Sequence, residues 1–108
     1  MGALPSPKPS PLSKPVLKIK GQIDALIAKM QKENKFSPTR ETLEECAEQL
    51  ITYIHDKHAQ TAPYESYLRA AIIDLTEVPV MAPQMQRIAF LTALQDASHE
   101  MELFLSCL

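Results

Sequence analysis

Residues 37–54 read SPTRETLEECAEQLITYI, a stretch in which a proline precedes apolar residues spaced three and four apart. Proline is tolerated in the first turn of a helix but breaks a helix interior, so it marks a helix start. Ser37 offers a side chain suited to the N-cap. The stretch therefore predicts an amphipathic helix whose buried face consists of Leu43, Cys46, Ala47, Leu50, Ile51 and Ile54.

The same arrangement recurs outward from this stretch in both directions. Apolar residues of helical period follow Pro15, Pro63 and Pro83, and they predict helices from Pro15 to Lys32, from Pro63 to Val78, and from Pro83 to the chain end. The chain has two glycines and no Asn-Gly or Asp-Gly pair for a hairpin turn. Because the predicted connections are short, we expect an all-α fold, an antiparallel four-helix bundle.

The N-terminal residues have a different composition. Prolines occupy positions 5, 7, 9 and 11, with serines among them. Such a segment has no apolar repeat to bury, so residues 1–14 are predicted to be a disordered, proline-rich arm. Residues 15–108 are then expected to form a single four-helix domain.

Charge is unevenly distributed along the chain. Residues 1–35 carry seven lysines against two acids, a net charge of +5, whereas residues 36–108 carry four basic residues against eleven acids, a net charge of −7. The acidic part repels phosphate, which disfavours nucleic-acid binding by the folded domain. A DNA-associated regulator that uses Lys8, Lys14, Lys18 and Lys20 remains the alternative.

No apolar stretch approaches the ~20 residues that a membrane span needs. Prolines, serines and lysines alternate near the N-terminus, where a signal peptide would have an apolar core. Cys46 and Cys107 are too far apart in sequence to suggest a disulfide framework, so we expect free thiols. These features predict a cytoplasmic protein without membrane contact.

The candidate catalytic and metal-binding groups are few. His55 and His58 lie three residues apart, as do Asp96 and His99, but neither pair has an indicated third ligand. The chain has no glycine-rich phosphate loop and no nucleophile elbow. We therefore expect a protein that is not an enzyme, with no catalytic residue, no cofactor and no metal site.

The end of the last helix is the predicted contact surface. At 1.5 Å per residue this helix is expected to span about 39 Å, longer than its three partners, so its end should overhang them. Successive helical residues turn by about 100°, so one bundle face cannot cover all the apolar residues there. The predicted interface with a partner or a second copy consists of Met101, Leu103, Phe104, Leu105 and Leu108. The alternative is that these residues belong to the protein's own core.

Together these features predict a small non-enzymatic module for protein-protein interaction, acting through the apolar end of its last helix. A regulator, an inhibitor or immunity protein, a chaperone and an adaptor all fit the composition. A marginally stable small domain gains from association, so a homodimer is also expected.

Overall fold

The computed structural model describes residues 11–108, which form helices and no strand. The helices are α1 (Ser13–Lys32), α2 (Arg40–Thr61), the short 3-10 helix η1 (Ala62–Tyr64), α3 (Glu65–Thr76) and α4 (Pro83–Ser106). The prediction of an all-α chain is confirmed for this part of the sequence. None of these helices is long and apolar enough to cross a membrane.

Only residues 11–14 of the predicted N-terminal arm belong to the part of the chain that the structure describes. Its first ten residues lie outside the described residues, but Ser13 and Lys14 already belong to α1. α1 thus begins two residues before the predicted helix start at Pro15. Leu12, just ahead of α1, accepts a hydrogen bond from the Tyr53 hydroxyl through its backbone carbonyl, which attaches the start of α1 to α2.

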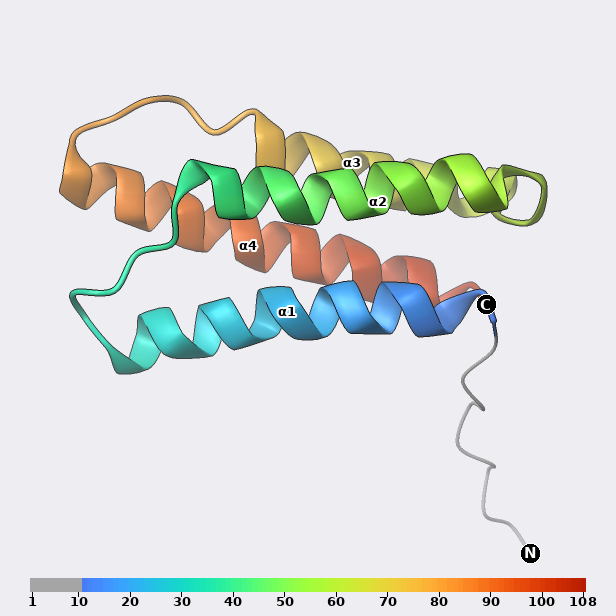
Figure 1. Cartoon of the computed structure of the whole chain (residues 1–108), viewed down its shortest axis with the longest axis horizontal. Coiled ribbons are helices and arrows are strands. Elements are labelled where there is room, and N and C mark those ends of the chain that lie inside the picture. The colour runs from blue at the N-terminus through green and yellow to red at the C-terminus, as the bar shows by residue number, and fades with distance from the viewer. Residues whose placement is uncertain (1–10) are drawn as a thin grey trace, which may run out of the picture.

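Successive helices run in opposite directions, and each packs against two others (Figure 1). α1 packs against α2 and α4, and α3 packs against the same two helices. The apolar stripes of all four helices meet in one core. Its largest fully buried apolar side chains are Val16, Ile23, Met30, Leu43, Leu50, Leu68, Leu75, Leu94, Met101 and Phe104.

The start of α2 differs from the prediction. Thr39, not Ser37, is the N-cap, and its hydroxyl oxygen accepts a hydrogen bond of 3.2 Å from the backbone N–H of Thr42. Pro38 is buried just ahead of the helix rather than in its first turn. A threonine hydroxyl can accept a hydrogen bond from a free N–H of the first turn, as a serine hydroxyl can. The N-cap of α2 thus lies two residues after the predicted one.

The buried face of α2 also differs from the prediction at Ile51 and Tyr53. Ile51, predicted to be buried, is 44% exposed, whereas Tyr53 is buried. The edge of the Tyr53 ring packs on Phe104 of α4, so the core side of α2 continues through Tyr53. Near its end α2 is kinked at Lys57. The short η1 turn then leads directly into α3, so the short connection expected here is a single 3-10 turn.

Arginine side chains hold the other connections in place. Arg87 of α4 donates a hydrogen bond of 2.8 Å to the carbonyl oxygen of Phe36 and further bonds to the carbonyls of Met30 and Glu33. These carbonyls lie at the end of α1 and in the segment that follows it. One guanidinium thus satisfies carbonyls that the helix end leaves free and fixes the α1–α2 connection against α4.

Candidate functional site

The predicted interface residues at the end of α4 do not share one environment. Met101 and Phe104 are fully buried in the core of the chain, which agrees with the alternative that they belong to the protein's own core. Leu103 and Leu105 are half-buried, and Leu108 is 45% exposed. Both side chains belong to the core cluster, where the ring of Phe104 packs on that of Tyr53 of α2.

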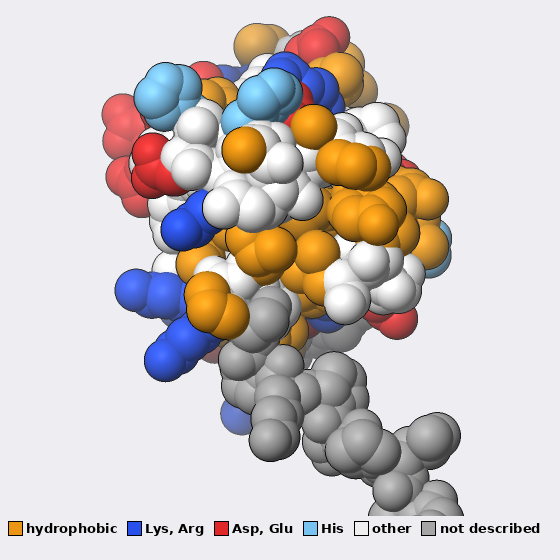
Figure 2. Space-filling model, turned by 90° about the vertical axis from the view of Figure 1, so that its right-hand side faces the viewer, with side chains coloured by type: hydrophobic (Ala, Val, Ile, Leu, Met, Phe, Trp, Pro, Cys, Tyr) orange, Lys and Arg blue, Asp and Glu red, His pale blue; other side chains and the backbone are white. Residues whose placement is uncertain are grey.

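The surface at this end of the molecule is nevertheless apolar in part. Figure 2 shows hydrophobic side chains gathered over the end where α1 begins and α4 ends. Leu103, Leu105 and Leu108 are the members of the predicted set that reach a surface. An interface built on these three residues stays a prediction.

A larger apolar surface lies between α3 and α4, at the end of the molecule opposite the start of α1 (Figure 1). Here a groove of about 430 Å³ is lined by Ile73 and Val78 on one side and by Met81, Met85 and Ile88 on the other. Ile73 is 52% exposed, and Met85 and Ile88 are each 56% exposed. Contiguous exposure of large apolar side chains marks binding surfaces, so this α3–α4 groove is the candidate site.

The edges of the α3–α4 groove are acidic. Asp74 and Glu77 of the α3 side and Asp96 of α4 line it. Burial, together with the nearby charges of Asp96 and Glu100, raises the pKa of Asp74 to about 6. Among residues 11–108 no cation forms an ion pair or hydrogen bond with any of these four carboxylates. The groove therefore combines an apolar floor with uncompensated negative charge.

The α3–α4 connection that closes one end of the groove is held by Arg40 of α2. Its guanidinium donates a hydrogen bond of 2.5 Å to the carbonyl oxygen of Val78 and one of 3.3 Å to that of Pro79. Gln86 bridges the same connection, since its amide donates to the Pro79 carbonyl and its oxygen accepts from the Met81 N–H, both at 3.0 Å. This wall of the groove is thus formed before any partner binds, which reduces the entropy lost on binding.

A second hollow, of about 460 Å³, lies between α2 and α3. Ile51, Ile54 and Ile72 form its apolar part, and His55, His58 and Arg69 are its polar members. We name it the α2–α3 hollow. Arg69 is its one arginine or lysine, and it forms an ion pair with Glu65.

Two polar members of this hollow, His58 and Arg69, bond to the buried carboxylate of Glu65. Glu65 accepts a hydrogen bond of 2.7 Å from Nε of Arg69 and shares one of 2.7 Å with Nδ1 of His58. Burial opposes ionisation of Glu65, but these hydrogen bonds and the two neighbouring charges hold its pKa below the usual value. The group connects the end of α2 to the start of α3, which is a structural role.

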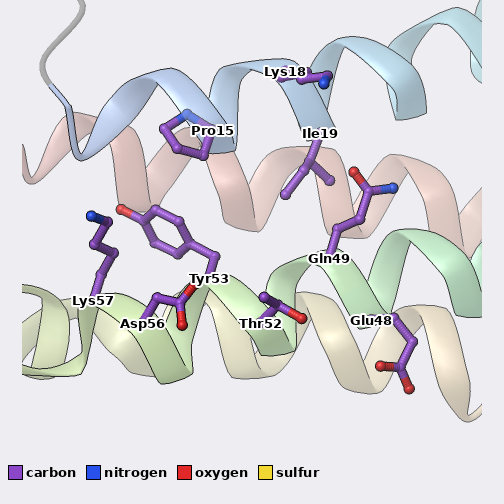
Figure 3. Close-up of a pocket in the computed structure, with 9 residues that line it drawn as sticks. All are labelled: Pro15, Lys18, Ile19, Glu48, Gln49, Thr52, Tyr53, Asp56 and Lys57. Carbon is purple, nitrogen blue, oxygen red and sulfur yellow. The ribbon is translucent and has the colours of Figure 1, made fainter.

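A third hollow, of about 430 Å³, follows the seam between α1 and α2 and is drawn in Figure 3. Ile19 of α1 points toward α2, while Gln49 and Tyr53 of α2 point toward α1. Its remaining lining residues are Pro15, Lys18, Glu48, Thr52, Asp56 and Lys57. Two lysines and two carboxylates give this rim a net charge of zero. It therefore favours neither a cationic nor an anionic ligand.

The groups considered for catalysis or metal binding are not brought together. Within the described part of the chain no three His, Cys, Asp or Glu side chains form a cluster that could hold a metal ion. Cys46 and Cys107 are free thiols, and burial, with the nearby charge of Glu45, raises the pKa of Cys46. A buried thiol with a raised pKa is a poor nucleophile.

Comparison with protein-family models, with curated proteins and with solved structures finds no match for this chain. The assignment of a site therefore depends on the geometry above.

Sequence reasoning missed the α3–α4 groove, although one signal for it was present. Ile88 opens the run Ile88-Ala89-Phe90-Leu91, and four consecutive helical residues cannot all face the same core. The same geometry predicted surface residues at the end of α4. Ile73 lies off the apolar stripe of α3, and only the pairing of α3 with α4 brings it to the same groove as Ile88.

Proposed function

We propose that this protein is a small four-helix module that binds another protein through its α3–α4 groove. The observation that carries the proposal is the exposure of Ile73, Met85 and Ile88 side by side along a preformed groove. Soluble domains rarely expose contiguous large apolar side chains without a partner to cover them. The role is binding rather than catalysis, as in a regulator, an inhibitor or immunity protein, a chaperone or an adaptor.

A different protein is a better partner than a second copy of this chain. The apolar end of α4 offers three partly exposed leucines, since Met101 and Phe104 are buried. A stable interface buries roughly 800 Å² on each side, more than three leucines supply. The proposal includes a cytoplasmic location, which agrees with the two free thiols of Cys46 and Cys107 because reducing compartments keep cysteines unpaired.

The alternative of a DNA-associated regulator has weaker support. Lys14 and Lys18 are exposed on α1, but Lys20 forms an ion pair of 2.8 Å with Asp24. Lys18 also shares the α1–α2 seam with Glu48 and Asp56, which repel phosphate. Binding to duplex DNA measured across a salt titration tests this alternative, because phosphate contacts weaken steeply as salt rises.

Site-directed photo-cross-linking in the cells that make the protein tests the binding role. A photoreactive amino acid replaces Ile88 in the α3–α4 groove, and the matched control replaces Ile51, which is 44% exposed in the α2–α3 hollow. We expect a covalent adduct with another protein from position 88 and little from position 51. Equal adducts from both positions, or none from position 88, contradict the proposal.

A further inference from the structure

The chemistry of the α3–α4 groove indicates what kind of segment it accepts. We propose that the groove binds a basic amphipathic helix of another protein, with apolar side chains on one face and lysines or arginines beside them. This inference rests on the proposed binding function and specifies its partner. Three features of the groove support it: its walls of helix, the spacing of its lining residues and its unpaired carboxylates.

The walls of the groove favour a helix over an extended peptide. They are formed by α3 and α4, whose interior backbone N–H and C=O groups already bond within each helix. A strand that lay there would leave its own backbone groups without partners. A helix satisfies its own backbone and needs only side-chain contacts, as when an amphipathic helix packs into an apolar groove.

The spacing of the lining residues fits helix-on-helix packing. Met85 and Ile88 lie three residues apart on one face of α4. On the other side, Ile73 lies in the last turn of α3, and Glu77 follows just after the helix ends. Such rows form ridges between which the side chains of a third helix insert. Methionine side chains adapt to the shape of a partner, which suits Met81 and Met85 to this position.

The carboxylates determine the charge of the partner. Asp74, Glu77 and Asp96 flank the apolar floor, and no cation pairs with them in the described part of the chain. A purely apolar partner would remove water from these groups without replacing it, which is costly. Lysines or arginines beside the apolar face of a partner compensate the charge and also accelerate association.

A second copy of this chain is a poor occupant. A twofold contact through the groove brings the same patch from each copy together, so Asp74 and Asp96 would face their own counterparts. The basic helix α1 of a second copy is also a poor occupant of the groove. It buries its apolar stripe and exposes only Leu17 among its large apolar side chains. Residues 1–10 are a poor fit in composition, with a single lysine and three prolines.

Binding of designed peptides to the full chain tests the inference. The probe is a fluorescent peptide of about 18 residues, near five helical turns, with leucines on one face and lysines on the other. The first control peptide replaces every lysine with glutamate, and the second scrambles the leucine-lysine sequence so that no apolar face forms. We expect fluorescence anisotropy to show saturable binding of the probe and at least about tenfold weaker binding of both controls.

Paired variants of the protein locate the binding. Ile88→Asn removes apolar surface from the α3–α4 groove, and Ile51→Asn makes the same exchange in the α2–α3 hollow, which no carboxylate lines. The double variant Asp74→Asn, Asp96→Asn neutralises the groove, and Glu44→Gln, Glu48→Gln neutralises two exposed acids of α2. We expect each groove variant to weaken probe binding about tenfold and each matched control to change it less than about twofold.

All substituted positions except Asp74 are exposed, and circular dichroism confirms that each variant is folded before its affinity is measured. Equal losses in groove and control variants, equal affinity for the glutamate peptide, or absence of saturable probe binding overturns the inference. So does a mass of two chains in light scattering that Ile88→Asn, but not Ile51→Asn, reduces to one chain mass. The binding function itself is tested separately, since cross-linking from position 88 does not depend on the charge of the partner.

Discussion

The ring of Tyr53 in α2 stands at 89° to the ring of Phe104 in α4, with 6.0 Å between their centroids. An edge-to-face pair of this kind adds to the stabilisation that burial alone provides. Tyr53 also donates a hydrogen bond to the carbonyl of Leu12, so one side chain connects the end of α4, the middle of α2 and the start of α1. Phe104 is therefore part of the core rather than of a contact surface.

Truncation of Phe104 is expected to destabilise the fold. Phe104→Ala removes a fully buried aromatic ring and should lower the free energy of unfolding by about 3 to 5 kcal/mol. Leu108→Ala at the exposed chain end should cost less than about 1 kcal/mol. Urea unfolding followed by circular dichroism measures both. A Phe104→Ala protein as stable as wild type would mean that Phe104 is not part of the core.

Two substitutions test which face of α2 is buried. Leu50 is fully buried and Glu44 is exposed. Leu50→Ala should lower the free energy of unfolding by about 2 to 5 kcal/mol, whereas Glu44→Ala should lower it by less than about 0.5 kcal/mol. Similar losses in denaturant unfolding would mean that the buried face of α2 is wrongly assigned.

Glu65 should make the protein sensitive to acid. Its pKa is lowered in the fold by hydrogen bonds from Arg69 and His58, which outweigh the effect of burial. A carboxylate of this kind stabilises the fold above its unfolded pKa, and that stabilisation is lost as the pH falls through the folded pKa. Glu65→Gln should therefore lower the Tm by a few degrees at pH 7, and the difference from wild type should shrink in acid. A difference that stays constant from neutral pH to pH about 3 contradicts this role.

Asp74 should have the opposite pH dependence. Burial, with the charges of Asp96 and Glu100, raises its pKa to about 6. Its ionised form therefore destabilises the fold above this pH, and the penalty disappears as the pH falls to the unfolded value near 4. Asp74→Asn should raise the free energy of unfolding by roughly 1 kcal/mol at pH 7, because water screens part of the effect. Thermal unfolding of wild type and variant across pH measures this gain in stability. If the gain persists at pH about 4, ionisation of Asp74 is not its cause.

The oligomeric state tests what remains of the predicted interface. Leu103, Leu105 and Leu108 alone expose too little surface for a stable dimer, so we expect one chain mass in light scattering after size exclusion. A mass of two chains that Leu108→Glu reduces to one would instead support the sequence prediction of self-association through the end of α4.

The sequence alone determined the class of the fold. Prolines ahead of apolar repeats, with two glycines in the whole chain, predicted helices close to the observed bounds of α1 and α4. These features are local, because helical period and the missing N–H of proline act within a few residues. The buried positions of Leu43, Cys46, Leu50 and Ile54 followed from the same repeat.

Tertiary structure decided which apolar residues are covered. Phe104 and Ile88 each lie in an apolar run of α4, yet Phe104 packs on Tyr53 and Ile88 is left in the open α3–α4 groove. That difference depends on which helices pack on each side of α4. The link between Glu65 and His58 likewise requires η1 to turn the chain so that α3 starts beside the end of α2. Contacts between residues on different helices depend on how those helices pair, and the period of a single helix contains no information about its neighbours.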